Sequence, residues 1–101
     1  MSREIQWTKS ARQTYLDILL YLQGKWGDET AVKFDERFRS RISSIKISPY
    51  MFPATAHFRD KNIRRCVVSK QTSFYYQVDD DFVYILAFYD NRRNPEGLEL
   101  E

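Results

Sequence analysis

The best candidates for chemistry in this chain are basic side chains at the two ends of an aromatic, strand-forming region. Lys61, Arg64 and Arg65 stand at its start, and Arg92 and Arg93 follow its last apolar run. Grouped guanidinium and ammonium ions can bind phosphates or a carboxylate-rich peptide. The same charges at the edge of a β-sheet also keep it soluble. The pattern therefore predicts either a binding surface or a solubility feature, and both interpretations stay open.

Arg64 and Arg65 are neighbours in a predicted strand, so their side chains should point to opposite faces of the sheet. At most one of them can then contact a given ligand directly. Arg64, Arg93 and His57, which is the only histidine, are the candidates for catalysis. His57 has no recognisable catalytic partner, so an ordinary loop side chain is the alternative interpretation.

Metal and phosphate-loop chemistry are not indicated. One histidine and one cysteine give none of the ligand spacings of a zinc site, and three glycines form no phosphate-binding loop. The only acidic run, residues 79–81, is interpreted as a hairpin turn. We expect neither a metal nor another cofactor.

Length and composition indicate one globular domain over residues 1–101. Cys66 can form no disulfide within the chain, which suits a reducing cytoplasm, and we expect it to be a small buried hydrophobe. The amino terminus lacks the apolar segment of a signal peptide, and no run approaches the roughly 20 apolar residues of a membrane span. The net charge of +2 is too small to argue for nucleic acid.

The carboxyl-terminal third predicts an antiparallel meander of three strands. Runs rich in Val, Ile, Phe and Tyr cover roughly residues 63–69, 72–79 and 82–89. The last run is apolar or aromatic at every position, so water can cover neither of its faces and it should lie inside the sheet. We expect Val83, Ile85 and Leu86 to be inaccessible.

The preceding residues predict a short strand over 3–7 and two amphipathic helices. Thr8 or Ser10 should cap the first helix, and Gly27 should end it, with Asp28 capping the second. The apolar stripes are Ala11, Tyr15, Ile18, Leu19, Leu22 and Trp26 on the first helix, and Ala31, Phe34, Phe38, Ile42 and Ile45 on the second. So short a connection requires an antiparallel helical hairpin.

These elements predict an α+β fold in the order β-α-α-β-β-β. An N-terminal strand joins a four-stranded, mainly antiparallel sheet, and the helical hairpin packs on one face of that sheet. Trp26, Phe34 and Phe38 should lie beneath the sheet. Residues 48–61 form the longest irregular segment, and such a loop is often functional or held by its own apolar side chains.

Short pieces in a fixed order along the chain carry a resemblance to a known family. They are Trp7-Thr8 with Ala11, residues 15–22, Trp26-Gly27, Ala31 with Phe34, Ser48-Pro49, Ile63-Arg64, residues 74–78, residues 83–86 and residues 90–95. Together these pieces resemble the RelE/ParE toxin superfamily of bacterial type II toxin–antitoxin modules. The likeness spans about residues 4–95, and the ParE-like, plasmid-stabilisation branch looks closer than RelE.

The resemblance also bears on catalysis. RelE-type ribonucleases cut messenger RNA in the ribosome with basic side chains on the sheet and a tyrosine near the carboxyl terminus. Arg64 matches one of those basic positions, but Cys66, Ser73 and Asn91 stand at others, and residues 96–101 contain no tyrosine. Fewer charges make the phosphate transition state harder to stabilise. The resemblance to ParE implies instead a toxin that poisons DNA gyrase without being an enzyme.

The resemblance further implies a cognate antitoxin that wraps the toxin in a hetero-oligomer and neutralises it. Lys61, Arg64, Arg65, Arg92 and Arg93 are the candidates for contacting the antitoxin or the target. Two alternatives stay open, and with them the question whether the chain is an enzyme. One is a RelE-like, ribosome-dependent mRNA endoribonuclease, and the other is an inactive relic that only binds a partner.

Overall fold

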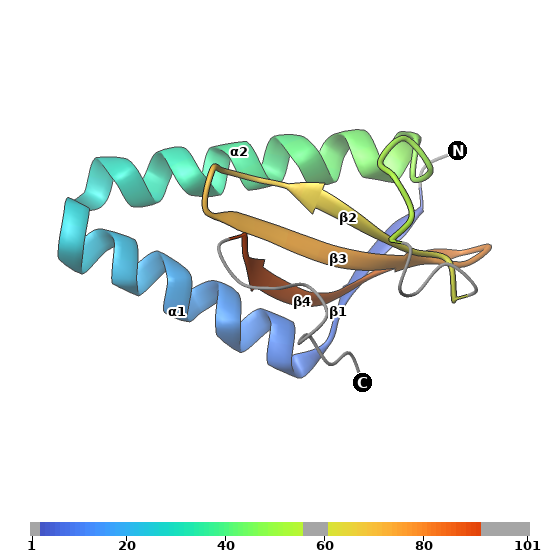
Figure 1. Cartoon of the computed structure of the whole chain (residues 1–101), viewed down its shortest axis with the longest axis horizontal. Helices are drawn as coiled ribbons and strands as arrows, with labels where there is room; N and C mark the ends of the chain where they lie inside the picture. The colour runs from blue at the N-terminus through green and yellow to red at the C-terminus, as the bar shows by residue number, and fades with distance from the viewer. Residues whose placement is uncertain (1–2, 56–60, 92–101) are drawn as a thin grey trace.

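The computed structural model describes residues 3–55 and 61–91. The elements are β1 (Glu4–Trp7), α1 (Lys9–Trp26), α2 (Asp28–Ile47), β2 (Ile63–Val67), β3 (Thr72–Val78) and β4 (Phe82–Asp90). This order confirms the predicted β-α-α-β-β-β arrangement. Figure 1 shows the two helices diverging from their junction, with the strands lying across the space between them. Neither helix of this described part is long and apolar enough to cross a membrane.

The four strands form one sheet in the order β1-β4-β3-β2. The β2–β3 and β3–β4 pairs are antiparallel, as the meander predicts, whereas β1 pairs with β4 in parallel. The apolar strand β4 therefore lies inside the sheet. At the β3–β4 turn, Asp79 Oδ1 accepts hydrogen bonds from the backbone N–H groups of Asp81 and Phe82. The aspartate run is thus a turn, as predicted.

A β-bulge in β4 changes which of its residues are buried. Tyr75 is opposite Ala87 and Tyr76 is opposite Ile85, so Leu86 is an extra residue without a partner in the register. Val83 and Ile85 are fully buried, as predicted. Leu86 is only half-buried, and the prediction that it is inaccessible was wrong because simple alternation does not anticipate a bulge.

Thr8 joins the start of α1 to this bulge. Its Oγ1 accepts the Ala11 N–H at 3.0 Å, which makes Thr8 the N-cap, and donates to the Leu86 carbonyl at 3.0 Å. Its own N–H donates to the Ile85 carbonyl at 3.1 Å. Thr8 therefore accepts a hydrogen bond from a backbone N–H in the first turn of α1 and donates one to the carbonyl of the bulged residue. Ser10, the other predicted cap, lies within the helix.

Gly27 forms the junction of the two helices. It adopts a φ of 99°, and its N–H donates to the Gln23 carbonyl at 3.0 Å, so it closes α1 as predicted. Gly27 also stands immediately before α2, and Asp28 is the first residue of that helix rather than its cap. Asp28 instead accepts a hydrogen bond from the Gln23 side chain.

The core between the sheet and the helices is largely aromatic. The Phe38 ring centroid lies 4.6 Å from that of Tyr15, 5.2 Å from that of Phe74 and 5.6 Å from that of Phe88. Phe34 and Phe38 are buried, as predicted. Trp26 is 62% exposed, so its predicted place beneath the sheet was wrong. It is the last residue of α1, where Lys25 Nζ lies 5.6 Å from its ring centroid.

A polar contact links the two helices beside this core. Tyr15 Oη donates to Asp35 Oδ1, and Arg39 Nε lies 2.7 Å from Asp35 Oδ2. Burial alone would raise the pKa of the Asp35 carboxyl, but the hydrogen bonds from Tyr15 and Arg39 outweigh it and lower that pKa below its ordinary value. Burial and the bond to Asp35 raise the pKa of Tyr15, so its phenol stays protonated.

Truncation of Phe38 should test the core directly. Phe38→Ala should lower the free energy of unfolding by about 3–5 kcal/mol, because it empties a buried aromatic site. Trp26→Ala is the matched control, and it should cost less than about 1 kcal/mol because the ring is mostly exposed. Urea unfolding of both variants measures the difference. A cost below about 1 kcal/mol at Phe38 would contradict this core.

Asp35 should make stability depend on pH in the acid range. Because its pKa is lowered by folding, its contribution is present above the unfolded pKa of about 3.9 and is lost as the pH falls through the folded pKa. Asp35→Asn should cost about 1 kcal/mol at pH 7, since the Arg39 partner is largely exposed, and much less below about pH 3. Urea unfolding at several pH values measures this. A difference between the two proteins that is independent of pH would refute the assignment.

Candidate functional site

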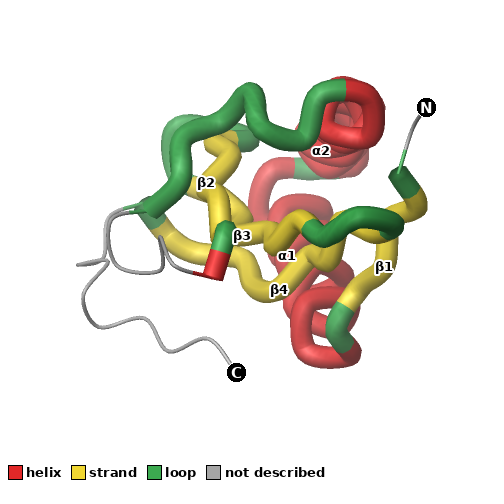
Figure 2. The backbone as a smooth tube through the Cα atoms, turned by 90° about the vertical axis from the view of Figure 1, so that its right-hand side faces the viewer, coloured by secondary structure: helices red, strands yellow, loops and turns green. Residues whose placement is uncertain are grey.

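The segment after α2 lies against the outer edge of β2, where the predicted basic site begins. Ala54 forms an isolated antiparallel bridge with Arg64. The Thr55 N–H donates to the Ile63 carbonyl at 3.0 Å, and the Arg65 N–H donates to the Pro53 carbonyl at 3.2 Å. Figure 2 shows this connection passing from α2 to the β2 side of the sheet. The long irregular segment is thus partly held by strand-like pairing.

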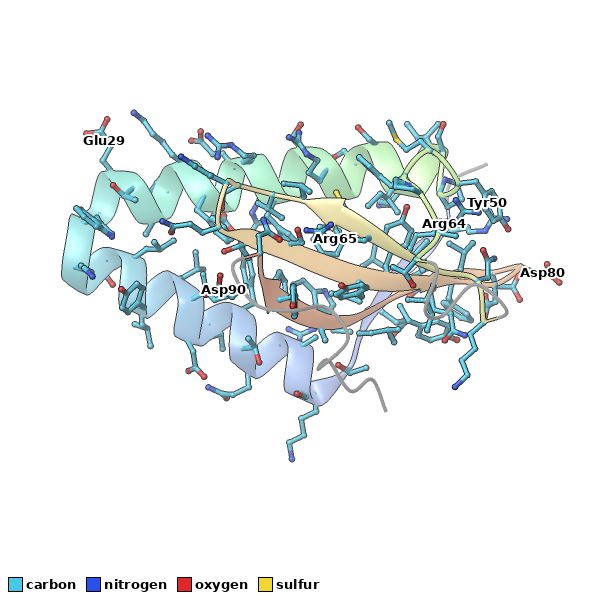
Figure 3. The ribbon with its side chains drawn as sticks, in the orientation of Figure 1. Glu29, Tyr50, Arg64, Arg65, Asp80 and Asp90 are labelled. Carbon is cyan, nitrogen blue, oxygen red and sulfur yellow. The ribbon has the colours of Figure 1, made fainter. Side chains whose placement is uncertain are left out.

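Arg64 fastens this segment to the sheet. Its Nη1 donates to the Phe52 carbonyl at 2.7 Å and to the Tyr50 carbonyl at 3.2 Å, and its guanidinium carbon lies 4.9 Å from the Tyr50 ring centroid. Figure 3 shows Arg64 beside Tyr50 at one end of β2. A guanidinium suits this contact because its planar fork donates several bonds while its face stacks on the ring. Arg64 therefore has a structural task that the sequence did not indicate.

Arg65 belongs to a different polar cluster, on the sheet face opposite the helices. Its Nη2 donates to Asn91 Oδ1 at 2.9 Å, and Ser73 Oγ donates to the same oxygen. Asn91 Nδ2 in turn donates to the Ser69 and Lys70 carbonyls, each at 3.2 Å. Figure 3 shows Arg65 over the sheet, apart from Arg64 and Tyr50. The prediction that the two arginines point to opposite faces fits these partners.

Two polar groups in or beside this cluster have no hydrogen-bond partner among the described residues. Tyr75 and Tyr89 pack edge to face beside it, with ring centroids 6.0 Å apart. Tyr89 Oη and Arg65 Nε are buried and have no hydrogen-bond partner among the residues that the structure describes. Such groups are costly to leave unpaired.

The described residues offer few groups with the protonation state that acid–base catalysis needs. Burial raises the pKa of Tyr75, although the nearby Arg65 acts in the other direction, so its phenol is protonated at neutral pH. Burial also raises the pKa of the Cys66 thiol to about 12. Cys66 is fully buried and unreactive in this form, as its strand position predicts. No group of three or more potential metal ligands lies together in this part of the chain.

Comparison with known proteins shows to which family the chain belongs. The sequence model described as "ParE toxin of type II toxin-antitoxin system, parDE" matches residues 5–95, from β1 to beyond β4. The chain belongs to the ParE toxin family. The predicted resemblance to RelE/ParE toxins is therefore confirmed, and the family implies an antitoxin partner. No curated protein sequence matched the chain in the comparison.

Solved structures share the fold of this ParE-family chain. The chromosomal ParDE system from P. aeruginosa has a TM-score of 0.70 at 14% identity, covering 88% of this chain and 96% of the other. The YoeB/ParE toxin from Agrobacterium tumefaciens has a TM-score of 0.64 at 14% identity, with coverages of 87% and 98%. The YoeB dimer from Staphylococcus aureus gives 0.62 at 14% identity, with coverages of 86% and 94%. At this identity the likeness concerns the fold.

The predicted site residues that the structure of this ParE-family member describes have separate sets of contacts. Lys61 is exposed just before β2, and its carbonyl accepts a hydrogen bond from the Gln77 side chain at 2.9 Å. Arg64 and Arg65 bond to separate groups. His57, Arg92 and Arg93 lie outside the described residues, so their roles stay predictions.

Sequence reasoning missed two polar contributors. The sequence pattern indicated no role for Arg41 of α2, but its Nε donates to the Val67 carbonyl at 3.2 Å. Asn91 was noted only as a missing basic residue, yet it connects Arg65, Ser73 and the β2–β3 turn. Only the position of Asn91, directly after an apolar strand, could have suggested a role, and the spacing of Arg41 offered no comparable signal.

Replacement of Arg64 should show its structural role. Arg64→Ala should lower the free energy of unfolding by about 2 kcal/mol, because two charge-assisted bonds to the loop are lost. Hydrogen exchange should also become faster at the Thr55 and Arg65 amides. Arg64→Lys should restore only part of the loss, since an ammonium cannot reproduce the planar fork.

Lys61→Ala is the control for charge, and it should change stability by less than about 0.5 kcal/mol. Unchanged stability and unchanged amide exchange in Arg64→Ala would mean that Arg64 is free to serve a ligand. Its candidacy as a catalytic residue would then be restored.

Proposed function

We propose that this chain is a growth-inhibiting toxin that a cognate antitoxin neutralises, and that it poisons DNA gyrase rather than cutting RNA. The observation that carries the proposal is the match of the ParE toxin family to residues 5–95. The action takes place in the cytoplasm, where gyrase and the antitoxin would meet the toxin.

The chemistry of the sheet supports a toxin that is not an enzyme. Arg64, the best-matched catalytic candidate, is bonded to loop carbonyls. Ser73 and Asn91 stand where the RelE resemblance expects basic residues, and they bond to each other. The Tyr75 phenol and the Cys66 thiol are both protonated at neutral pH. Phosphoryl transfer without a base or a set of positive charges would be slow.

A ribosome-dependent ribonuclease remains the second candidate because of Arg65. Its guanidinium lies on the face away from the helices, near Tyr75 and Tyr89, and its Nε has no partner among the described residues. A phosphate could accept hydrogen bonds from this group and from Tyr89 Oη. This arrangement would bind RNA more readily than cleave it, since burial raises the pKa of Tyr75 and its phenol is protonated at neutral pH.

Parallel assays on the purified chain should separate the two activities. We expect it to inhibit gyrase supercoiling of plasmid DNA and to trap cleaved DNA, and to leave messenger RNA intact on translating ribosomes. Induced expression in growing bacteria should arrest growth, and co-expression of the protein from the adjacent reading frame should restore it.

Arg65→Ala tests the second candidate, and Arg37→Ala, at an exposed position on α2, is its charge-matched control. Codon-positioned cuts that vanish in Arg65→Ala but persist in Arg37→Ala would replace the gyrase proposal with the ribonuclease. A chain that binds the antitoxin yet never arrests growth would be the inactive relic.

A further inference from the structure

A second line of side chains runs along α1, on the side away from the core. Gln13, Leu16, Leu20 and Gln23 recur at spacings of three, four and three residues, and all four are exposed. Leu16 is 49% exposed and Leu20 is 65% exposed. Spacings that alternate between three and four are typical of a helix that packs against another helix. We call these four residues the outer seam, and Figure 1 shows α1 along one border of the molecule.

A shallow groove beside Leu20 can receive an apolar side chain. It lies between α1 and α2 and has a volume of about 390 Å³. Leu19, Ala31 and Val32 contribute apolar surface to it, and Val32 is 54% exposed. Exposed leucine beside such a groove is apolar surface that another helix can cover.

The two glutamines of the outer seam are already turned to local partners. Gln13 Nε2 donates to Asp17 Oδ1 at 3.0 Å, and Gln23 Nε2 donates to Asp28 Oδ1 at 2.8 Å. Each amide still has its oxygen and a second N–H for another hydrogen bond. Covering these side chains therefore costs less than burying an unpaired amide, and two facing glutamines could bond to each other.

Gly24 lies beside the outer seam, and the packing of the single chain does not explain it. Gly24 is an interior residue of α1, where glycine is less favourable than alanine. A Cβ atom added there would meet nothing within 4 Å in the described structure beyond the adjacent part of α1. Glycine at such a position permits a close approach from outside the chain.

Opposite charges stand at the two ends of the outer seam. Lys9 and Arg12 are exposed near the start of α1, and Asp28 is exposed directly after its junction with α2. Lys25, near the same end as Asp28, lies on another side of the helix, where its Nζ donates to Tyr21 Oη at 3.1 Å. An antiparallel copy of this surface would place the basic end of one chain at the acidic end of the other.

We propose that the outer seam is the interface of a homodimer, in which two copies of α1 pack antiparallel across a two-fold axis. The axis passes midway between Leu16 and Leu20, so that Leu16 packs against Leu20 of the partner subunit and enters the groove beside it. Gln13 then lies opposite Gln23 of the partner subunit. The proposal goes beyond the proposed function and does not depend on it.

Self-complementarity is the reason for choosing a second copy as the occupant. Reversing the outer seam about its midpoint places leucine on leucine and glutamine on glutamine, as a two-fold interface requires. It also brings Arg12 towards Asp28 of the partner subunit, while Gly24 leaves room for Gln13 of the partner subunit. Paired polar residues fix the register of such helices, as they do in coiled coils.

The dimer should be weak because the interface is small. About three turns of one helix from each copy should bury less than about 1,200 Å² in total, which is the range of transient complexes. We therefore expect a dissociation constant between about 10 μM and 1 mM, with subunits in rapid exchange. Salt should weaken the dimer further, since the pairs at its ends are exposed.

Sedimentation equilibrium of the full chain tests for the dimer, and amide shifts locate its interface. The mean mass should rise from that of one chain towards that of two between about 10 μM and 1 mM. Over the same range, the amides that shift with protein concentration should lie in residues 12–24 and beside the groove.

Variants of the outer seam give the test its specificity. Leu20→Glu should weaken the dimer by more than about tenfold, because it places a charge in the apolar contact. Tyr21→Glu is the matched control, since Tyr21 is 59% exposed on another side of the same helix, and it should change the dimer less than about threefold. Gly24→Ala should raise resistance to urea yet weaken the dimer, two opposite effects that a purely structural glycine would not produce.

Charge reversal tests the antiparallel register. Arg12→Glu and Asp28→Lys should each weaken the dimer about three- to tenfold, because each creates a pair of like charges. The double variant restores opposite charges and should bind within about threefold of the original chain. Urea unfolding checks that every variant is folded.

The inference is overturned if the chain stays monomeric up to about 1 mM, or if Leu20→Glu and Tyr21→Glu have equal effects. A dimer that the double variant fails to restore would overturn the two-fold register. Amides of the outer seam that shift only when an antitoxin is added would mean that a different partner covers it, and the homodimer would be wrong. None of these measurements uses growth arrest, so failure of the proposed function would leave their outcome unchanged.

Discussion

Burial of β4 on both faces is the constraint from which most of this fold follows. Val83 and Ile85 face the helices and are fully buried, while Tyr89 is buried in a second cluster on the other face. A strand of this kind needs neighbours at both edges as well as cover above and below. β1 and β3 supply the edges, and the helical hairpin supplies one cover. The bulge at Leu86 then allows Thr8 to join the sheet to α1, so that the first turn of the hairpin is placed by the central strand itself.

Sequence periodicity predicted the elements well because local patterns determine them. The aromatic positions Phe34 and Phe38 repeat at helical spacing and are buried, and the apolar run of β4 lies inside the sheet. Periodicity gave wrong burial predictions where a helix extends past the sheet and where a bulge shifts the register of a strand. Trp26 continues the stripe of α1 past the point where packing against the sheet stops, and Leu86 falls on a bulge.

The candidate site was harder to predict because its contacts join residues far apart in the chain. Arg64 bonds to carbonyls in a loop that begins 14 residues earlier, and Arg65 bonds to a side chain 26 residues later. Charge alone does not distinguish an arginine that holds a loop from one that awaits a ligand. The difference appears only when every donor of the guanidinium has been traced to its acceptor. Arg64 Nη1 bonds to two loop carbonyls and Arg65 Nη2 to one side chain, while the Nε of each is buried without a partner among the described residues.

The position of β4 in the chain has a consequence for synthesis on the ribosome. β1 precedes both helices in the chain, but its neighbour in the sheet is β4, the last of the described strands. Until β4 is complete, the apolar faces of both helices and of β3 lack their common support, and long-range pairing of this kind is slow to form. A nascent chain therefore exposes the aromatic surfaces of its helices until β4 has been synthesised. During that interval association through these surfaces competes with folding.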